Sequence, residues 1–301
     1  MKMLNVLNIS FKTDFEQDLD NIYREYLEEA GIDFKERKSA FFQYMNANDR
    51  LITPQPRQVY EASVLKIPEK LKENYEKLKQ KIINGENINA YQSTKLHDSS
   101  FIDKLFTFEN LVHFHLGGEI ELHPKFNRMY MERTGDLIVG LVKENSVYFL
   151  EIKPHHKDTW LNKSYLEILS KEFPEAIEDK KLHMTDGDEF NYTLIDNLRR
   201  ISMNYAIKTE NGNVYTNTPV VLTRDNVRLK HVIMKDQLMT NIKGSAEEIK
   251  QSLRENKIPG HYQIKLRKIV KHPDSFIYEI SKDNQDYQVV HIAKDKMIIF
   301  K

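Results

Sequence analysis

The sequence contains no cysteine, and this absence excludes several kinds of chemistry. Disulfide bonds, thiolate zinc sites, iron–sulfur clusters and cysteine nucleophiles all need a residue that the chain lacks. Glycine is also scarce, with 10 residues in 301. The motifs GxxxxGK[ST], GxGxxG and GxSxG are absent, so nothing indicates a P-loop hydrolase, dinucleotide binding or an α/β-hydrolase nucleophile.

An excess of charge of one sign is missing too, because 45 Lys and Arg residues balance 45 Asp and Glu residues. A net charge of zero excludes a uniformly basic coat for nucleic acid, although it allows a local patch. No apolar run approaches the roughly 18 residues of a membrane span, and residues 1–18 lack the apolar core of a signal peptide. We therefore expect a soluble, cytoplasmic protein with no membrane partner.

The chain does contain enough apolar sequence, 40% of its residues, to bury a core. Its pattern changes along its length. Residues 1–105 are predicted to form a helical region, residues 106–205 a central α/β core, and residues 206–301 a mixed domain with a β-meander. We predict an α+β fold with a helical N-terminal part, a central mixed or antiparallel sheet with flanking helices, and a C-terminal β-meander.

The clearest helix is predicted between Pro68, which suits a first turn, and Gly85, which suits a C-terminal stop. Another helix is predicted to begin after Asp14, which resembles an N-cap, and to end at Gly31. These N-terminal helices offer a surface for a protein partner.

Short apolar runs at residues 111–116, 137–142 and 147–152, separated by polar turns, predict strands of the central sheet. Asn211-Gly212 is the strongest hairpin signal in the chain, because both residue types tolerate the positive φ angles of a two-residue turn.

Residues 133–156 carry the most informative group of polar side chains. With residues 143–146 as a turn, antiparallel pairing places Asp136 opposite Lys153. Charges grouped at one end of a buried hairpin are costly unless they pair or bind an ion. Four side chains then share one face at the open end of the hairpin: Asp136, Glu151, Lys153 and His155.

This arrangement resembles the PD-(D/E)xK nuclease superfamily, in which an Asp on one strand and a Glu-x-Lys on the next hold a divalent metal. The matching residues are Asp136, Glu151 and Lys153, and a glycine replaces the family's proline before the Asp. The resemblance implies a nuclease in which both carboxylates hold Mg²⁺ or Mn²⁺ and the lysine activates water or stabilises charge. His155 or Arg133 would contact the phosphate. The resemblance also implies a DNA or RNA partner and a role in phage defence or a toxin system.

A second resemblance leads to different chemistry. The order of two strands and a histidine is similar to RelE/YafQ-type mRNA-cleaving toxins, which need no metal. The matching positions are Arg133, Lys153 and His155, and the implied activity is a metal-independent RNase. The segment His113–Gly117, together with Trp160, is also similar to uncharacterised bacterial proteins and implies no activity. A third alternative is a non-catalytic protein-interaction module in which the hairpin is structural.

His113 and His115 lie two residues apart on a predicted strand and therefore share a face. With Glu119 or Glu121 nearby, they predict an alternative metal site for zinc or manganese. The other interpretation is that both imidazoles are packed in the core.

The C-terminal part has more basic than acidic residues, and four of the basic residues lie close together on one predicted strand. Such a cluster predicts contact with a nucleic-acid backbone. A basic edge strand that prevents aggregation is the alternative. A second basic pair, Arg199 and Arg200, suggests a phosphate clamp. The strand residues are Lys265, Arg267, Lys268 and Lys271.

Overall fold

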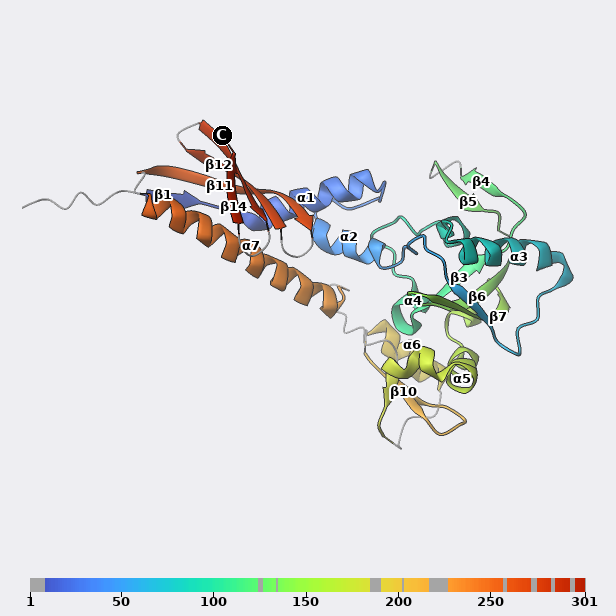
Figure 1. Cartoon of the computed structure of the whole chain (residues 1–301). Coiled ribbons are helices and arrows are strands. Elements are labelled where there is room, and N and C mark those ends of the chain that lie inside the picture. The colour runs from blue at the N-terminus through green and yellow to red at the C-terminus, as the bar shows by residue number, and fades with distance from the viewer. Residues whose placement is uncertain are drawn as a thin grey trace, which may run out of the picture. The chain divides into compact units, whose positions relative to one another are not determined.

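The computed structural model of the chain describes residues 9–123, 127–133, 135–184, 191–201, 203–216, 227–256, 259–271, 275–282, 285–292 and 296–300. Helices occur beside mixed and antiparallel sheets, which confirms the predicted α+β class (Figure 1). Two compact units divide the chain: one is residues 46–229, and the other combines residues 1–45 with residues 230–301. These units cut across the three consecutive regions predicted from sequence, because the first strand and helix pack with the C-terminal strands.

The discontinuous unit is built on a five-stranded sheet in the order β1-β11-β12-β13-β14. The four C-terminal strands form an antiparallel meander, as predicted, and β1 pairs parallel to β11. Helix α1 and most of helices α2 and α7 belong to the same unit as this sheet. The elements are β1 (Ile9–Lys12), α1 (Phe15–Glu29), α2 (Ala40–Asn48), α7 (Leu229–Glu255), β11 (Gly260–Lys271), β12 (Ser275–Lys282), β13 (Gln285–Ile292) and β14 (Lys296–Phe300).

Helix α1 begins where the sequence predicts, since the Asp14 side chain accepts a hydrogen bond from the Gln17 backbone N–H. Its polar side chains also satisfy the backbone of β11 beyond the end of β1. Asp18 accepts from the Leu266 N–H at 2.9 Å, and the Tyr26 hydroxyl donates to the Ile269 carbonyl. α1 therefore covers part of a strand edge that would otherwise be unpaired.

The other unit is built on a four-stranded sheet in the order β2-β7-β6-β3, in which β2 runs parallel to β7 and the other pairs are antiparallel. Helix α3 packs on one face of this sheet and helix α5 on the other, and each face has its own apolar cluster. The elements are β2 (Gln58–Glu61), α3 (Glu69–Asn84), β3 (Leu111–His115), β6 (Asp136–Val142), β7 (Ser146–Pro154) and α5 (Lys163–Glu172).

Helix α3 confirms the sequence prediction at both ends. Pro68 is its N-cap, and Gly85 follows its last turn with a left-handed φ of 74°. A Cβ at Gly85 would lie 2.5 Å from the backbone nitrogen of Pro56, so both the φ angle and the close approach require glycine.

Smaller elements surround the four-stranded sheet. They are the 3₁₀ helices Asn89–Tyr91, Lys157–Trp160 and Pro174–Lys180, the helices α4 (Lys104–Glu109) and α6 (Tyr192–Arg200), and the strands β4 (Ile120–His123), β5 (Arg128–Met131), β8 (Lys181–Leu182), β9 (Ala206–Lys208) and β10 (Val214–Thr216). None of the described helices is long and apolar enough to cross a membrane.

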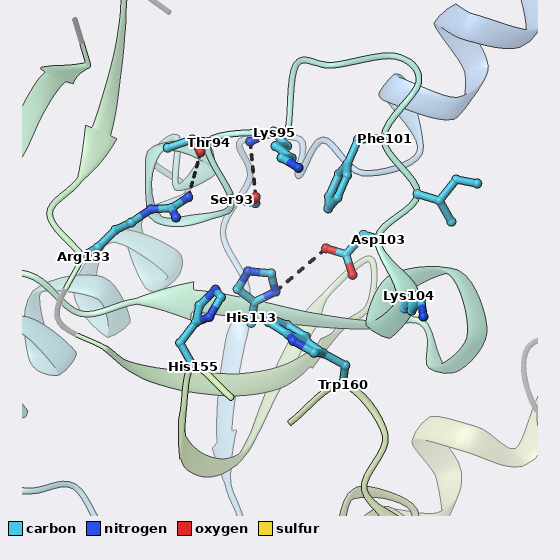
Figure 2. A pocket seen from close by; sticks show the side chains of 11 residues that line it. Ser93, Thr94, Lys95, Phe101, Asp103, Lys104, His113, Arg133, His155 and Trp160 are labelled. Atoms are coloured by element: carbon cyan, nitrogen blue, oxygen red, sulfur yellow. Dashed lines mark hydrogen bonds and ion pairs between the residues drawn. The ribbon is translucent and has the colours of Figure 1, made fainter. Parts of the chain in front are cut away.

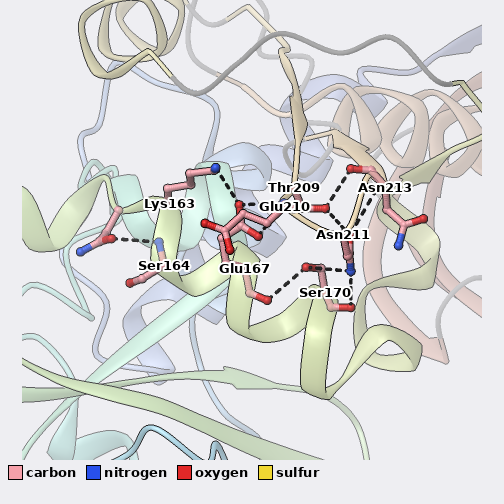
Figure 3. A network of polar contacts seen from close by, with 9 residues as sticks. Lys163, Ser164, Glu167, Ser170, Thr209, Glu210, Asn211 and Asn213 are labelled. Atoms are coloured by element: carbon pink, nitrogen blue, oxygen red, sulfur yellow. Dashed lines mark hydrogen bonds and ion pairs between the residues drawn. The ribbon is translucent and has the colours of Figure 1, made fainter.

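Asn211-Gly212 lies in the loop between Lys208 and Val214, the last paired residues of β9 and β10, so the predicted hairpin is confirmed. The loop is longer than a two-residue turn, and of the two residues only Gly212 has a positive φ. A polar network fastens this hairpin to α5 (Figure 3). The Glu210 N–H donates to the carboxylate of Glu167 at 3.0 Å, and the Asn211 amide donates to the Ser170 carbonyl at 3.1 Å. The hairpin and α5 are therefore held together by directional bonds.

Candidate functional site

The hairpin that carries the predicted site has a different register from the one predicted. Its turn end pairs as expected, but a β-bulge leaves Leu150 of β7 without a partner. Beyond the bulge, Asp136 pairs with Pro154 instead of Lys153. A bulge sets two residues against one, so it shifts every later pair by one position and exchanges the faces of their side chains.

The shift separates the two carboxylates that were predicted to hold a metal. Asp136 lies on the α3 face, where its Oδ2 is 2.8 Å from the Nζ of Lys70. Glu151 lies on the α5 face, where it accepts a hydrogen bond from the Ser164 hydroxyl and lies 3.2 Å from the Nζ of Lys153. The predicted common face of Asp136 and Glu151 is therefore wrong, and their carboxylates do not converge on one ion.

Two other predicted residues do meet. Arg133 precedes β6, His155 follows β7, and both line a cavity of about 360 Å³ (Figure 2). The Arg133 guanidinium donates to the Thr94 hydroxyl at 2.7 Å. The His155 backbone N–H donates to the Gly135 carbonyl at 2.6 Å, which ties the two strand ends together. The cavity is lined by Ser93, Thr94, Lys95, Phe101, Ile102, Asp103, Lys104, His113, Arg133, His155 and Trp160.

His113 and Asp103 form the floor of this cavity. His113 comes from β3 and is buried, with its Nδ1 3.9 Å from the Oδ2 of Asp103. The other carboxylate oxygen of Asp103 accepts the backbone N–H groups of Leu105 and Phe106, so Asp103 also caps helix α4. Burial lowers the pKa of His113 to about 3, so its imidazole is neutral at pH 7.

His115, also on β3, does not line the cavity. It is buried, and neither of its ring nitrogens has a hydrogen-bond partner within the described ranges. Its ring stacks on that of His155 with the centroids 6.1 Å apart, and it meets the His113 ring edge to face at 5.7 Å. Burial lowers the pKa of His115 to about 3 as well.

The alternative metal site at His113 and His115 gains no support from the arrangement. The carboxylate that faces His113 is Asp103, from the N-terminus of α4, and not Glu119 or Glu121. Within the described part of the chain, no three His, Asp or Glu side chains are placed to hold an ion. The site of a divalent metal therefore stays a prediction from sequence.

The lining of the cavity is cationic with aromatic walls. Lys95, Lys104 and Arg133 contribute positive charges, whereas Asp103 is the one acidic lining residue. The Nζ of Lys95 lies 5.3 Å from the centroid of the Phe101 ring, which holds this cation at the cavity. Such a charge balance favours an anionic ligand.

The sequence marks Arg133, His113 and His155 as candidate site residues, but it does not indicate the segment 93–104 that completes the cavity. Asp103 carries a usable signal, because an Asp two residues before a buried Leu105 is a typical N-cap. Nothing in the local sequence indicates that this cap faces a histidine of β3.

The basic strand β11 belongs to the other unit. Arg267 pairs with Glu279 at 2.6 Å, Lys265 is half-buried and Lys268 is exposed, while the side chain of Lys271 lies outside the described residues. β11 lies between β1 and β12 in the sheet order, but β1 pairs only with residues 260–263, so the basic residues lie beyond that pairing, where α1 covers part of the strand edge. The protective edge strand stays a prediction. Contact of β11 with a nucleic-acid backbone stays a prediction.

Comparisons with protein-family models, curated proteins and solved structures find no match to this chain. What the cavity can bind and do therefore follows from its own side chains.

Proposed function

We propose that the chain is a metal-independent RNase whose active site is the cavity lined by Arg133 and His155. The supporting observation is that Arg133 and His155, which flank the ends of two different strands, line the same cationic cavity. The metal-dependent alternative needs two carboxylates that face one ion, and Asp136 and Glu151 lie on opposite faces of the sheet.

RNA suits a site without a metal because it carries its own nucleophile. Once a base removes its proton, the 2′-hydroxyl next to the scissile phosphate can attack the phosphorus, and a 2′,3′-cyclic phosphate forms as the bond from phosphorus to the 5′-oxygen breaks; DNA lacks this group. The exposed imidazole of His155 can accept the proton of the 2′-hydroxyl and give it to the departing 5′-oxygen. The guanidinium of Arg133 can stabilise the negative charge that develops on the phosphorus oxygens.

The remaining polar groups position the phosphate. Lys95 and Lys104 raise the positive potential around the cavity and attract the polynucleotide. The neutral His113, with Asp103 on its Nδ1 side, is a hydrogen-bonding group at the floor and adds no charge. Because His113 is neutral and Asp103 is acidic, the anion is held by the three exposed cations.

The test is cleavage of labelled single-stranded RNA and DNA by the wild type, with Mg²⁺ or with EDTA. We expect RNA to be cut in both conditions and DNA in neither. His155→Ala and Arg133→Ala are each expected to lower the rate by about 10²-fold or more. His156→Ala is the matched control, since it removes an exposed histidine that does not line the cavity.

Two outcomes would contradict the proposal. Cutting that EDTA abolishes, and that Glu151→Gln abolishes, would restore the metal-dependent nuclease. No cutting in any condition would favour the non-catalytic interaction module.

The wider biological predictions rest on sequence alone. A role in phage defence or a toxin system comes from the resemblances. A protein partner at the N-terminal helices is likewise a prediction, and the apolar residues of α1 and α3 are buried within their own units.

A further inference from the structure

Trp160 is the one tryptophan of the chain, and it forms a wall of the candidate active site. Its ring meets those of His113 and His155 edge to face, with centroid distances of 4.9 and 5.1 Å. Figure 2 shows that Trp160 and Phe101 border the same space as the two histidines. Trp160 is only half-buried, so part of its indole can contact a ligand.

The backbone of Trp160 is held by a buried charge outside the cavity. The Nη1 of Arg199, in α6, donates to the Trp160 carbonyl at 2.6 Å. The Nε of the same guanidinium donates to the Tyr205 hydroxyl at 2.9 Å, and its Nη2 donates to the Glu109 carboxylate. The Arg199 side chain is only 2% exposed, so these three bonds compensate for its desolvation.

Arg199 and Arg200 do not form the phosphate clamp that their adjacency suggested. The Arg200 side chain is 63% exposed and pairs with Asp196, one helical turn earlier, at 2.7 Å. Arg199 points into the protein, and its guanidinium is engaged by Glu109, Tyr205 and Trp160. Neighbouring positions on a helix point in different directions, which explains the separation.

We propose that Trp160 is a stacking platform for one unpaired base of single-stranded RNA, and that Arg199 is the positioning residue that holds it at the cavity. The choice of RNA rests on the proposed function. The cavity combines the two elements of single-strand recognition, which are cations for the backbone and an aromatic surface for a base.

The experiment measures Trp160 fluorescence, which reports on this one ring, while an RNA oligonucleotide with 2′-O-methyl riboses is added. Such an oligonucleotide cannot be cleaved through its 2′-oxygen, so binding is measured apart from chemistry. We expect the single strand to quench the emission, and an abasic or a duplex oligonucleotide of the same length to bind about tenfold more weakly.

Arg199→Lys is expected to alter the emission of the free protein and to weaken binding of the single strand about tenfold, because one ammonium cannot reproduce the three-way contact. Arg200→Lys is the matched control and is expected to change neither. Tyr205→Phe is the second variant if Arg199→Lys does not fold; it removes the hydroxyl that accepts from Arg199 and donates to Glu109 but keeps the guanidinium. The same changes in emission and in affinity, smaller in size, are expected from it.

The two proposals fail in different ways. Cleavage of RNA without any change in Trp160 emission would overturn the stacking platform and leave the RNase intact. Quenching by the single strand without cleavage of unmodified RNA would overturn the RNase and leave the platform intact. Folded variants at Arg199 and Tyr205 with the emission and affinity of the wild type would overturn the role of Arg199.

Discussion

Neutralising Asp136 and Glu151, singly and together, tests whether these carboxylates act independently. Asp136→Asn removes an ion pair with Lys70, whose side chain is 68% exposed. A pair this exposed contributes about 0–1 kcal/mol to the free energy of unfolding. Glu151→Gln keeps an acceptor for Ser164 but loses the less exposed pair with Lys153, which contributes roughly 1–2 kcal/mol.

The two losses are expected to add, because the side chains lie on opposite faces of the sheet and share no partner in the contacts described above. Additivity to within about 0.5 kcal/mol is normal for such sites. Carboxylates that shared an ion would behave differently. Either variant alone would then remove the ion, and the second substitution would cost little more.

The assay is urea unfolding of the wild type, both single variants and the double variant, with and without Mg²⁺. An ion present at a hundred times its Kd stabilises the folded state by about 2.7 kcal/mol. We expect no stabilisation of that size in any of the four proteins. A coupling free energy above about 1 kcal/mol, or stabilisation of the wild type by Mg²⁺ that either single variant removes, would refute the separation of the two carboxylates.

Two further predictions concern stability. Because burial lowers the pKa of His113 and His115 to about 3, the unfolded chain binds more protons below roughly pH 6.5, and stability should fall as the pH falls from there towards 3. The urea midpoint of His115→Gln should depend less on pH across this range than that of the wild type. An unchanged dependence would contradict a lowered pKa of His115 in the folded protein. Gly85→Ala should cost about 2 kcal/mol or more in the same assay, because it adds a contact with Pro56 to the left-handed φ. Gly212 has a φ of 84°, and a Cβ there would have no neighbour within 4 Å, so Gly212→Ala should cost about 1 kcal/mol. Equal losses of stability in Gly85→Ala and Gly212→Ala would exclude a role for Pro56.

Features set by a few neighbouring residues could be predicted from the sequence. The ends of α3 follow from Pro68 and Gly85, and the β9–β10 turn follows from Asn211-Gly212. Caps and tight turns depend on local φ angles and on hydrogen bonds within a few positions, so the residues that specify them are close together in the chain.

The same local information could not give the pairing of β1 with β11, whose strands are separated by about 250 residues. The edge of β11 is completed by side chains of α1, and nothing in either segment alone indicates the other. Long-range partners are selected by packing across the whole unit, which no short window contains.

For the candidate site, the sequence by itself determined which residue types were available: Arg133 and His155 as candidates for phosphate contact, His113 as a candidate metal ligand, and no cysteine at all. The tertiary structure decided which of them meet. One unpaired residue, Leu150, shifts the hairpin register and places Asp136 and Glu151 on opposite faces. Side chains alternate with a period of two, so a single extra residue reverses every face beyond it, and only the packed sheet reveals that it is there.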